Sequence, residues 1–221
     1  MKMIIRLMIW VLLIPMNLYS QIIKLDEGRL EAINVAASIK TVIGKVRVEV
    51  LDSSIKAFDK PTFAKIKGFE FKNGTIEIYV LSKLLPNAPG LSAGSIGIAF
   101  RIDDSNSKFE CIYVSPAKGR DTIQARRNQA VQYFSMPDNT YKRHGKEVPG
   151  QYESYADMGL NEWIKLKIVV KDARAKVFLN DVKQPSLVVN DLKNGTGSFG
   201  AIGLWVDVGT EGFFRDLEVY K

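Results

Sequence analysis

The last sixty residues of the chain, EWIKLKIVVKDARAKVFLNDVKQPSLVVNDLKNGTGSFGAIGLWVDVGTEGFFRDLEVYK at Glu162–Lys221, decide the fold. Apolar residues alternate with polar or small ones in 163–171, 175–179, 199–207 and 212–220, and glycine, asparagine and aspartate separate these runs. Such alternation is typical of strands with one buried face. Because no stretch keeps a helical period, the sequence predicts an all-β, two-sheet antiparallel sandwich of the jelly-roll type.

Further strands are expected upstream, in 42–51, 75–82, 96–103, 109–115 and 130–135. Asn73-Gly74 predicts a hairpin turn, since both residues tolerate a positive φ. Leu25–Ala37 is compatible with a short helix or an edge strand. Met136–Leu160 is long, polar and rich in turn residues, and a loop of this length in a compact domain is usually functional.

Composition sets the broad class. The chain has 221 residues, 46% of them hydrophobic and 25% charged, which suits one soluble domain with its own core. The net charge of +7 is spread along the sequence without a dense basic run, so a nucleic-acid partner is not expected. The only cysteine, Cys111, alternates with Phe109 and Tyr113 and is expected to be a buried apolar residue.

The first twenty residues resemble a signal peptide. Lys2 and Arg6 precede an apolar segment, Leu7–Met16, that is too short to span a membrane. Cleavage before Gln21 would leave one domain, 21–221, with a formal charge of +5, in the periplasm or outside the cell. The alternative is an uncleaved N-terminal anchor.

The tail also resembles a known superfamily. Segments similar to strands of concanavalin A-like and laminin G-like domains are Glu162–Ile168 (EWIKLKI), Ala175–Asp181 (AKVFLND), Gly200–Trp205 (GAIGLW) and Gly212–Val219 (GFFRDLEV). Phe71–Glu77 and Ala99–Ile102 look like the matching early strands, so the resemblance covers most of Phe58–Lys221. It points to the concanavalin A-like lectin and glucanase superfamily, in particular the laminin G-like and 3-keto-disaccharide hydrolase-type jelly rolls of secreted Bacteroidetes proteins. The resemblance implies a glycan or polysaccharide ligand, but the superfamily includes lectins, hydrolases, lyases and adhesion modules.

Candidate ligand-binding residues concentrate between Arg101 and Tyr155, where arginine, tyrosine and glutamine are frequent. Arginine can bind a carboxylate or sulfate through two hydrogen bonds. Together with the positive net charge, this makes an acidic glycan a candidate ligand. Strand alternation directs Arg101 away from the face shared by Ile98, Phe100 and Ile102, and directs Trp205 and Asp207 away from the aliphatic core. The expected ligand-binding residues are Arg101, Tyr113, Arg126, Arg127, Gln132, Tyr133, Tyr152, Trp205 and Asp207. For Trp205 the alternative is packing beneath a loop, and for Arg126 and Arg127 it is pairing with nearby aspartates.

Three functions remain open. The first is a secreted sugar-binding domain, and the second is a glycoside-cleaving enzyme or lyase in which Glu110 is the candidate catalytic group. The third is a structural module whose arginines are satisfied internally. His144 lies in a basic turn and is expected to be solvated, and none of the motifs GxSxG, HExxH, CxxC or the P-loop occurs. No cofactor is expected, although Asp103, Asp104 and Asp216 are candidates for a structural calcium ion.

Overall fold

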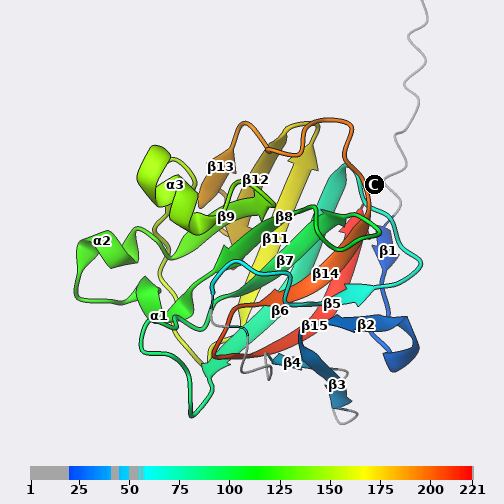
Figure 1. Cartoon of the computed structure of the whole chain (residues 1–221), viewed down its shortest axis with the longest axis horizontal. Helices are drawn as coiled ribbons and strands as arrows, with labels where there is room; N and C mark the ends of the chain where they lie inside the picture. Colours follow the sequence, from blue (N-terminus) through cyan, green and yellow to red (C-terminus); the bar gives the residue numbers. More distant parts are fainter. Residues whose placement is uncertain (1–19, 41–44, 50–54, 56, 221) are drawn as a thin grey trace, which may run out of the picture.

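The protein is a sandwich of two antiparallel sheets, as the alternation predicts (Figure 1). The computed structural model describes residues 20–40, 45–49, 55 and 57–220, so the expected signal segment lies outside the described residues except for Ser20. No helix in this part of the chain has the length and apolarity needed to cross a membrane.

Each sheet has one continuous strand order. Sheet A runs β13 (Leu187–Val189), β12 (Arg174–Leu179), β11 (Ile164–Lys171), β6 (Gly74–Leu84), β15 (Thr210–Tyr220), β4 (Lys45–Glu49) and β3 (Ala36–Lys40), and β1 (Ser20–Ile22) also pairs with β15. Sheet B runs β10 (Glu153–Ser154), β9 (Val131–Met136), β8 (Phe109–Val114), β7 (Ile96–Ile102), β14 (Ala201–Val206), β5 (Phe63–Ile66) and β2 (Leu30–Ile33). The helical turns are η1 (Glu27–Arg29), α1 (Pro116–Gly119), α2 (Gln124–Arg127) and α3 (Tyr141–Glu147). The three α segments lie together at one end of the sandwich (Figure 1).

The main core lies between the sheets and comes from the alternating aliphatic residues. On β11, Ile164, Leu166 and Ile168 are buried while the lysines between them are not. On β14, Leu204 and Val206 bury the inner face in the same way. Apolar side chains on both inner faces stabilise the sandwich because they leave water together on folding.

The expected Asn73-Gly74 hairpin is wrong. Phe71 bridges to Gly200 next to sheet B, whereas β6 starts at Gly74 in sheet A. The turn is therefore a crossover between the sheets. The Asn73 side chain shapes it by accepting a hydrogen bond from the Asp172 backbone N–H at 2.9 Å, a contact far away in sequence that no local pattern could reveal.

The long segment before β11 is not a plain loop, because it contains α3 and β10. The ambiguous N-terminal stretch, Leu25–Ala37, contains a single helical turn, η1, followed by two short edge strands, β2 and the start of β3.

Alternation fails at Arg101, which has a φ of 55° and sits at an irregularity in the pairing of β7 with β14. After such a bulge, each side chain of the strand points to the opposite face of the sheet from the one that strict alternation predicts. Ile102 therefore packs on the outer side of sheet B, not beside Ile98 and Phe100 as expected. The guanidinium of Arg101 is buried and donates to the backbone carbonyls of Lys72, Asp172 and Gly195, so it secures the crossover and is not open to a ligand.

A second apolar cluster covers the outer face of sheet B. Its centre is Trp205, which packs 5.0 Å from Tyr113 and 5.5 Å from Phe134 between ring centroids. The indole N–H donates to the carbonyl of Lys60 at 2.9 Å, so the segment before β5 lies over the ring. Trp205 does leave the main core, as expected, but it is completely buried and cannot be a sugar platform.

We expect Trp205→Ala to lower the free energy of unfolding by about 3–5 kcal/mol, the usual cost of deleting a fully buried aromatic side chain. Urea denaturation measures the change. The matched control is Trp163→Ala, since Trp163 is only partly buried between the Lys45 and Arg215 cations and should cost less. Equal losses for the two variants would contradict the packing of Trp205.

Candidate functional site

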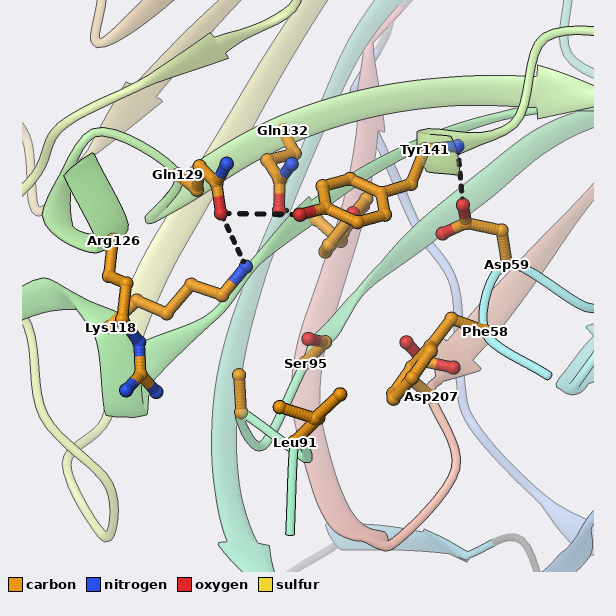
Figure 2. Close-up of a pocket in the computed structure, with 12 residues that line it drawn as sticks. Phe58, Asp59, Leu91, Ser95, Lys118, Arg126, Gln129, Gln132, Tyr141 and Asp207 are labelled. Carbon is orange, nitrogen blue, oxygen red and sulfur yellow. Dashed lines mark hydrogen bonds between the residues drawn. The ribbon is translucent and has the colours of Figure 1, made fainter. Parts of the chain in front are cut away.

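The candidate cavity opens on the outer face of sheet B and has a volume of about 330 Å³ (Figure 2). It lies beside the aromatic cluster, at the end of the sandwich that carries the α segments. The residues that line it are Phe58, Asp59, Leu91, Ala93, Ser95, Tyr113, Lys118, Arg126, Gln129, Gln132, Tyr141 and Asp207. Its size falls within the range of small-molecule pockets, roughly 300–1,000 Å³.

A row of paired residues across sheet B forms the floor. In register, Gln132 of β9 faces Tyr113 of β8, Tyr113 faces Gly97 of β7, and Gly97 faces Trp205 of β14. A Cβ on Gly97 would lie 2.2 Å from the carbonyl oxygen of Ile112, so only glycine lets the Tyr113 and Trp205 rings meet across it. The Tyr113 hydroxyl then donates to Gln132 Oε1 at 3.1 Å, which fixes both side chains.

Asp59 is the most unusual residue of the site. Its backbone has a φ of 56°, and its side chain is 3% exposed. Oδ2 accepts a hydrogen bond from the backbone N–H of Tyr141 at the start of α3, whereas Oδ1 has no partner. A buried acceptor without a partner costs about 1–3 kcal/mol, and strained backbone concentrates at functional sites. Sequence reasoning missed Asp59 because nothing in Phe58-Asp59-Lys60-Pro61 distinguishes it from a surface turn.

Asp207 follows β14 and supplies a second buried carboxyl group. Its Oδ1 accepts from the Val208 N–H at 2.9 Å, and its own N–H donates to the Ser95 carbonyl. Burial raises the pKa of Asp207 well above its usual range, and the charge of Asp59 raises it further. Burial also raises the pKa of Asp59 to about 7, against the opposing effects of the Tyr141 N–H and Lys118. Two such neighbours do not ionise together easily, so the pair holds a proton at neutral pH.

The opposite wall carries hydrogen-bond donors and amides (Figure 2). Lys118 Nζ donates to Gln129 Oε1 at 3.2 Å and lies 5.3 Å from the centroid of the Tyr141 ring. The Tyr141 hydroxyl donates to the same Gln129 oxygen at 3.3 Å. Burial lowers the pKa of Lys118. Lys118, Gln129 and Tyr141 were not among the expected ligand-binding residues, although Tyr141 lies in the long segment for which a function was expected.

The rim of the cavity is partly apolar. Leu91 is 78% exposed and Phe58 is half-buried at the entrance. Arg126 also lies at the rim, where its Nε pairs with Asp121 at 3.1 Å. Apolar surface beside clustered hydrogen-bonding groups suits a sugar ring, which presents C–H faces and hydroxyl edges.

The structure brings four of the expected residues to this cavity, namely Tyr113, Arg126, Gln132 and Asp207. The others lie elsewhere. Arg127 donates to the carbonyls of Asp121 and Thr122 within its own turn, at 2.7 and 3.1 Å. Arg101 and Trp205 have the structural roles given above.

Glu110 and Tyr133 lie on the inner side of sheet B. Glu110 is fully buried, with one carboxylate oxygen accepting from the Tyr133 hydroxyl and the other from the Asn194 backbone N–H at 2.9 Å. Burial raises the pKa of Glu110. Both oxygens already have partners and neither faces the cavity, so the geometry gives no support to Glu110 as a catalytic group.

Tyr152 and His144 pack against the inner network. The Tyr152 hydroxyl donates to Asp191 at 2.6 Å. His144 stacks beside Tyr133 and Tyr152, with ring centroids 6.1 and 4.4 Å away. The expectation of a solvated His144 is therefore wrong, because α3 folds the ring inward and leaves it 8% exposed.

Two of the three candidate calcium ligands have other partners. Asp103 accepts from the backbone N–H groups of Ser107 and Lys108, and Asp216 pairs with Arg215 at 2.8 Å. Within the described residues, no group of three or more His, Cys, Asp or Glu side chains could hold a metal ion. A structural calcium ion remains an untested prediction.

Comparisons with known proteins identify the fold. No family model and no curated protein sequence matches the chain. Among solved structures, a carbohydrate-binding module of Bacillus subtilis is 13% identical, with a TM-score of 0.54 over 86% of this chain and 94% of the module. A seed lectin of Lotus tetragonolobus is 11% identical, with a TM-score of 0.52 over 92% and 97%. A β-1,3-1,4-glucanase from a mouse hindgut metagenome is 12% identical, with a TM-score of 0.52 over 92% and 98%. The chain therefore has the concanavalin A-like jelly-roll fold that the sequence resemblance predicts.

We expect Asp59→Asn to stabilise the protein more at pH 8 than at pH 4. The unfolded Asp59 ionises near 3.8, whereas the folded one keeps its proton up to about 7, so the wild type loses stability as the pH rises between these values. Each pKa unit corresponds to about 1.4 kcal/mol, and we expect a gain of about 1–3 kcal/mol above pH 7. Urea denaturation across this pH range measures it.

An asparagine in place of Asp59 would tolerate the positive φ and could still accept from Tyr141, which makes the substitution conservative. The matched control is Asp104→Asn, the same substitution in an exposed hairpin turn. A pH-independent difference for Asp59→Asn would contradict a raised pKa at this carboxyl.

Proposed function

We propose that the protein is a secreted carbohydrate-binding domain, acting in the periplasm or outside the cell, which holds a sugar unit in the sheet B cavity. The observation that carries the proposal is Asp59, whose strained backbone and unpartnered carboxylate oxygen line a cavity with an apolar rim. A ligand that donates a hydrogen bond to Asp59 in the cavity would supply the missing partner. The jelly-roll fold agrees with this function but does not choose it, because the same fold has several functions.

The arginines give no independent support. Arg101, Arg126 and Arg127 all have internal partners, which is what a structural module without a sugar site would show. The cavity favours the sugar-binding hypothesis, since a purely structural module has no need for a buried, unpartnered carboxyl oxygen at the bottom of a pocket.

We expect the folded protein, screened against neutral and acidic glycans on an array and by calorimetry, to bind at least one of them. Gln129→Ala should weaken that binding by about tenfold, or about 1.4 kcal/mol, because Gln129 holds both Lys118 and Tyr141 in place. Gln151→Ala is the matched control, since Gln151 is exposed and does not line the cavity. If the protein binds none of the glycans while circular dichroism shows that it is folded, the proposed function is refuted.

Cleavage of glycosidic bonds is a second candidate function, favoured by the carboxyl pair and not by Glu110. Two carboxyl groups with raised pKa values in one cavity can act as proton donor and base. We expect Asp207→Asn to abolish any release of reducing sugar from a bound glycan. Glu110→Gln should only lower it, because Glu110 supports the strand that carries Gln132 and does not face the cavity. If Glu110→Gln alone abolishes release, the assignment to the cavity is wrong.

A further inference from the structure

The net positive charge of the described side chains lies on sheet A and not around the cavity on sheet B. On the solvent-facing positions of β4, β6, β11, β12 and β15 in sheet A, the described side chains comprise nine basic and four acidic residues, counting Asp216 at its bulge. The remaining described side chains comprise seventeen basic and eighteen acidic residues. Sheet A thus faces solvent with five net positive charges, and the rest of the described molecule carries a net charge of minus one. The basic net charge is consequently no argument for an acidic ligand in sheet B.

The cavity itself is rich in carboxyl groups. Asp59 and Asp207 line it, and Glu153 stands behind Gln132, whose Nε2 donates to Glu153 Oε2 at 3.4 Å. Facing them are two lining cations, Lys118 and Arg126. Arg126 is already paired with Asp121, so a ligand meets it as a partly neutralised group.

The acceptor left open lies on the carboxyl wall, whereas Lys118 on the opposite wall keeps further N–H groups for a ligand. Lys118 and the Tyr141 hydroxyl both donate to Gln129, and the Tyr113 hydroxyl donates to Gln132. Asp59 Oδ1, in contrast, is buried without any partner. Above pH 7, where Asp59 is ionised, the group that completes this acceptor must therefore donate a hydrogen bond to it.

We propose that the cavity admits an uncharged sugar unit, whose hydroxyls donate to Asp59 and Asp207, and that it excludes uronate and sulfated sugars. This inference rests on the proposed sugar-binding function and names its ligand class. A carboxylate or sulfate has no hydrogen to donate to Asp59 Oδ1. Once Asp59 is ionised, such a group would also lie against a buried negative charge, which is a repulsive arrangement at low local dielectric.

A cationic amino sugar fits less well than a neutral one, although it could donate to Asp59. Lys118 projects into the same cavity from the opposite wall, and Lys60 lies close enough to lower the pKa of Asp59. A hydroxyl donates to the carboxyl side and accepts from the lysine side, so it matches both walls without adding charge. The cavity thus selects neutral sugars in two ways: it repels charged sugars, and it forms hydrogen bonds with the hydroxyls of neutral ones.

Calorimetric titration at pH 8, where Asp59 is ionised, tests the proposal. The probes are neutral gluco-, galacto-, manno-, xylo-, arabino- and fructo-oligosaccharides, oligogalacturonate, a sulfated galactan fragment and chitosan oligomers. We expect a neutral sugar to bind, and every charged probe to bind at least about tenfold more weakly. Raising the salt from about 50 mM to about 500 mM should change the neutral affinity less than about twofold, because no ion pair forms. Tighter binding of a uronate, sulfated or amino sugar would overturn the inference and leave sugar binding itself intact.

Variants test whether Asp59 and Asp207 cause the selectivity for neutral sugars. At pH 8, Asp59→Asn should weaken neutral binding by about tenfold or more, since an amide oxygen is a weaker acceptor than the ionised Asp59 carboxylate. The double variant Asp59→Asn, Asp207→Asn should improve oligogalacturonate binding by a similar factor, because Lys118 and Arg126 remain while the repulsion is gone. The matched control is Lys176→Glu on the exposed face of sheet A, which changes the net charge by two without touching the cavity and should alter neither affinity.

Two outcomes separate this inference from the proposed function. If Lys176→Glu alters uronate binding as much as the double variant, net charge and not the carboxyl pair selects the ligand, and the inference is wrong. If no probe of any class binds to folded protein, the proposed function fails and the inference fails with it.

Discussion

The hydrogen bond from the Trp205 indole to the carbonyl of Lys60 is the constraint on which the site depends. The segment before β5 crosses the aromatic cluster of sheet B at this point, and the indole N–H has no other way to be satisfied once the ring is fully buried. Fixing Lys60 also fixes its neighbour Asp59 over the sheet. The carboxyl group of Asp59 is thereby kept beside Asp207, although both groups would be better solvated in water.

Asp59 also connects sheet B to the helical cover of the cavity. Its carboxyl group accepts the Tyr141 N–H at the start of α3, and the Tyr141 side chain extends from there to Gln129. One strained residue therefore positions both walls of the cavity, the carboxyl wall directly and the donor wall through Tyr141. This explains why a costly conformation can persist, since relaxing Asp59 would release the ring that orders the opposite side.

The sequence predicts the features that follow from short-range alternation. It identifies the β11 and β12 hairpin, and the separation of Trp205 and Asp207 from the aliphatic core. It also names Tyr113 and Gln132 as candidate ligand-binding residues, and both line the cavity. It fails where one residue breaks the pattern. At Arg101 the positive φ reverses the face to which the following side chains point. The Asn73 turn is shaped by a contact with Asp172, about a hundred positions away in the sequence. Asp59 could not be found because its burial depends on Trp205 and Tyr141, both distant in sequence.

Glu110 shows how a residue can resemble a catalytic group and still have a structural role. On β9, Tyr133 points inward to Glu110 while its neighbour Gln132 points outward to the cavity. The Tyr133 hydroxyl also accepts the Lys193 N–H at 2.8 Å, and Glu110 accepts the Asn194 N–H, so this buried network ties β8 and β9 to the loop after β13. A strand fixed from its inner side presents its outer side chains in one position. Glu110 therefore contributes to the site by holding the strand that carries Gln132, from the side of the sheet that a ligand does not reach.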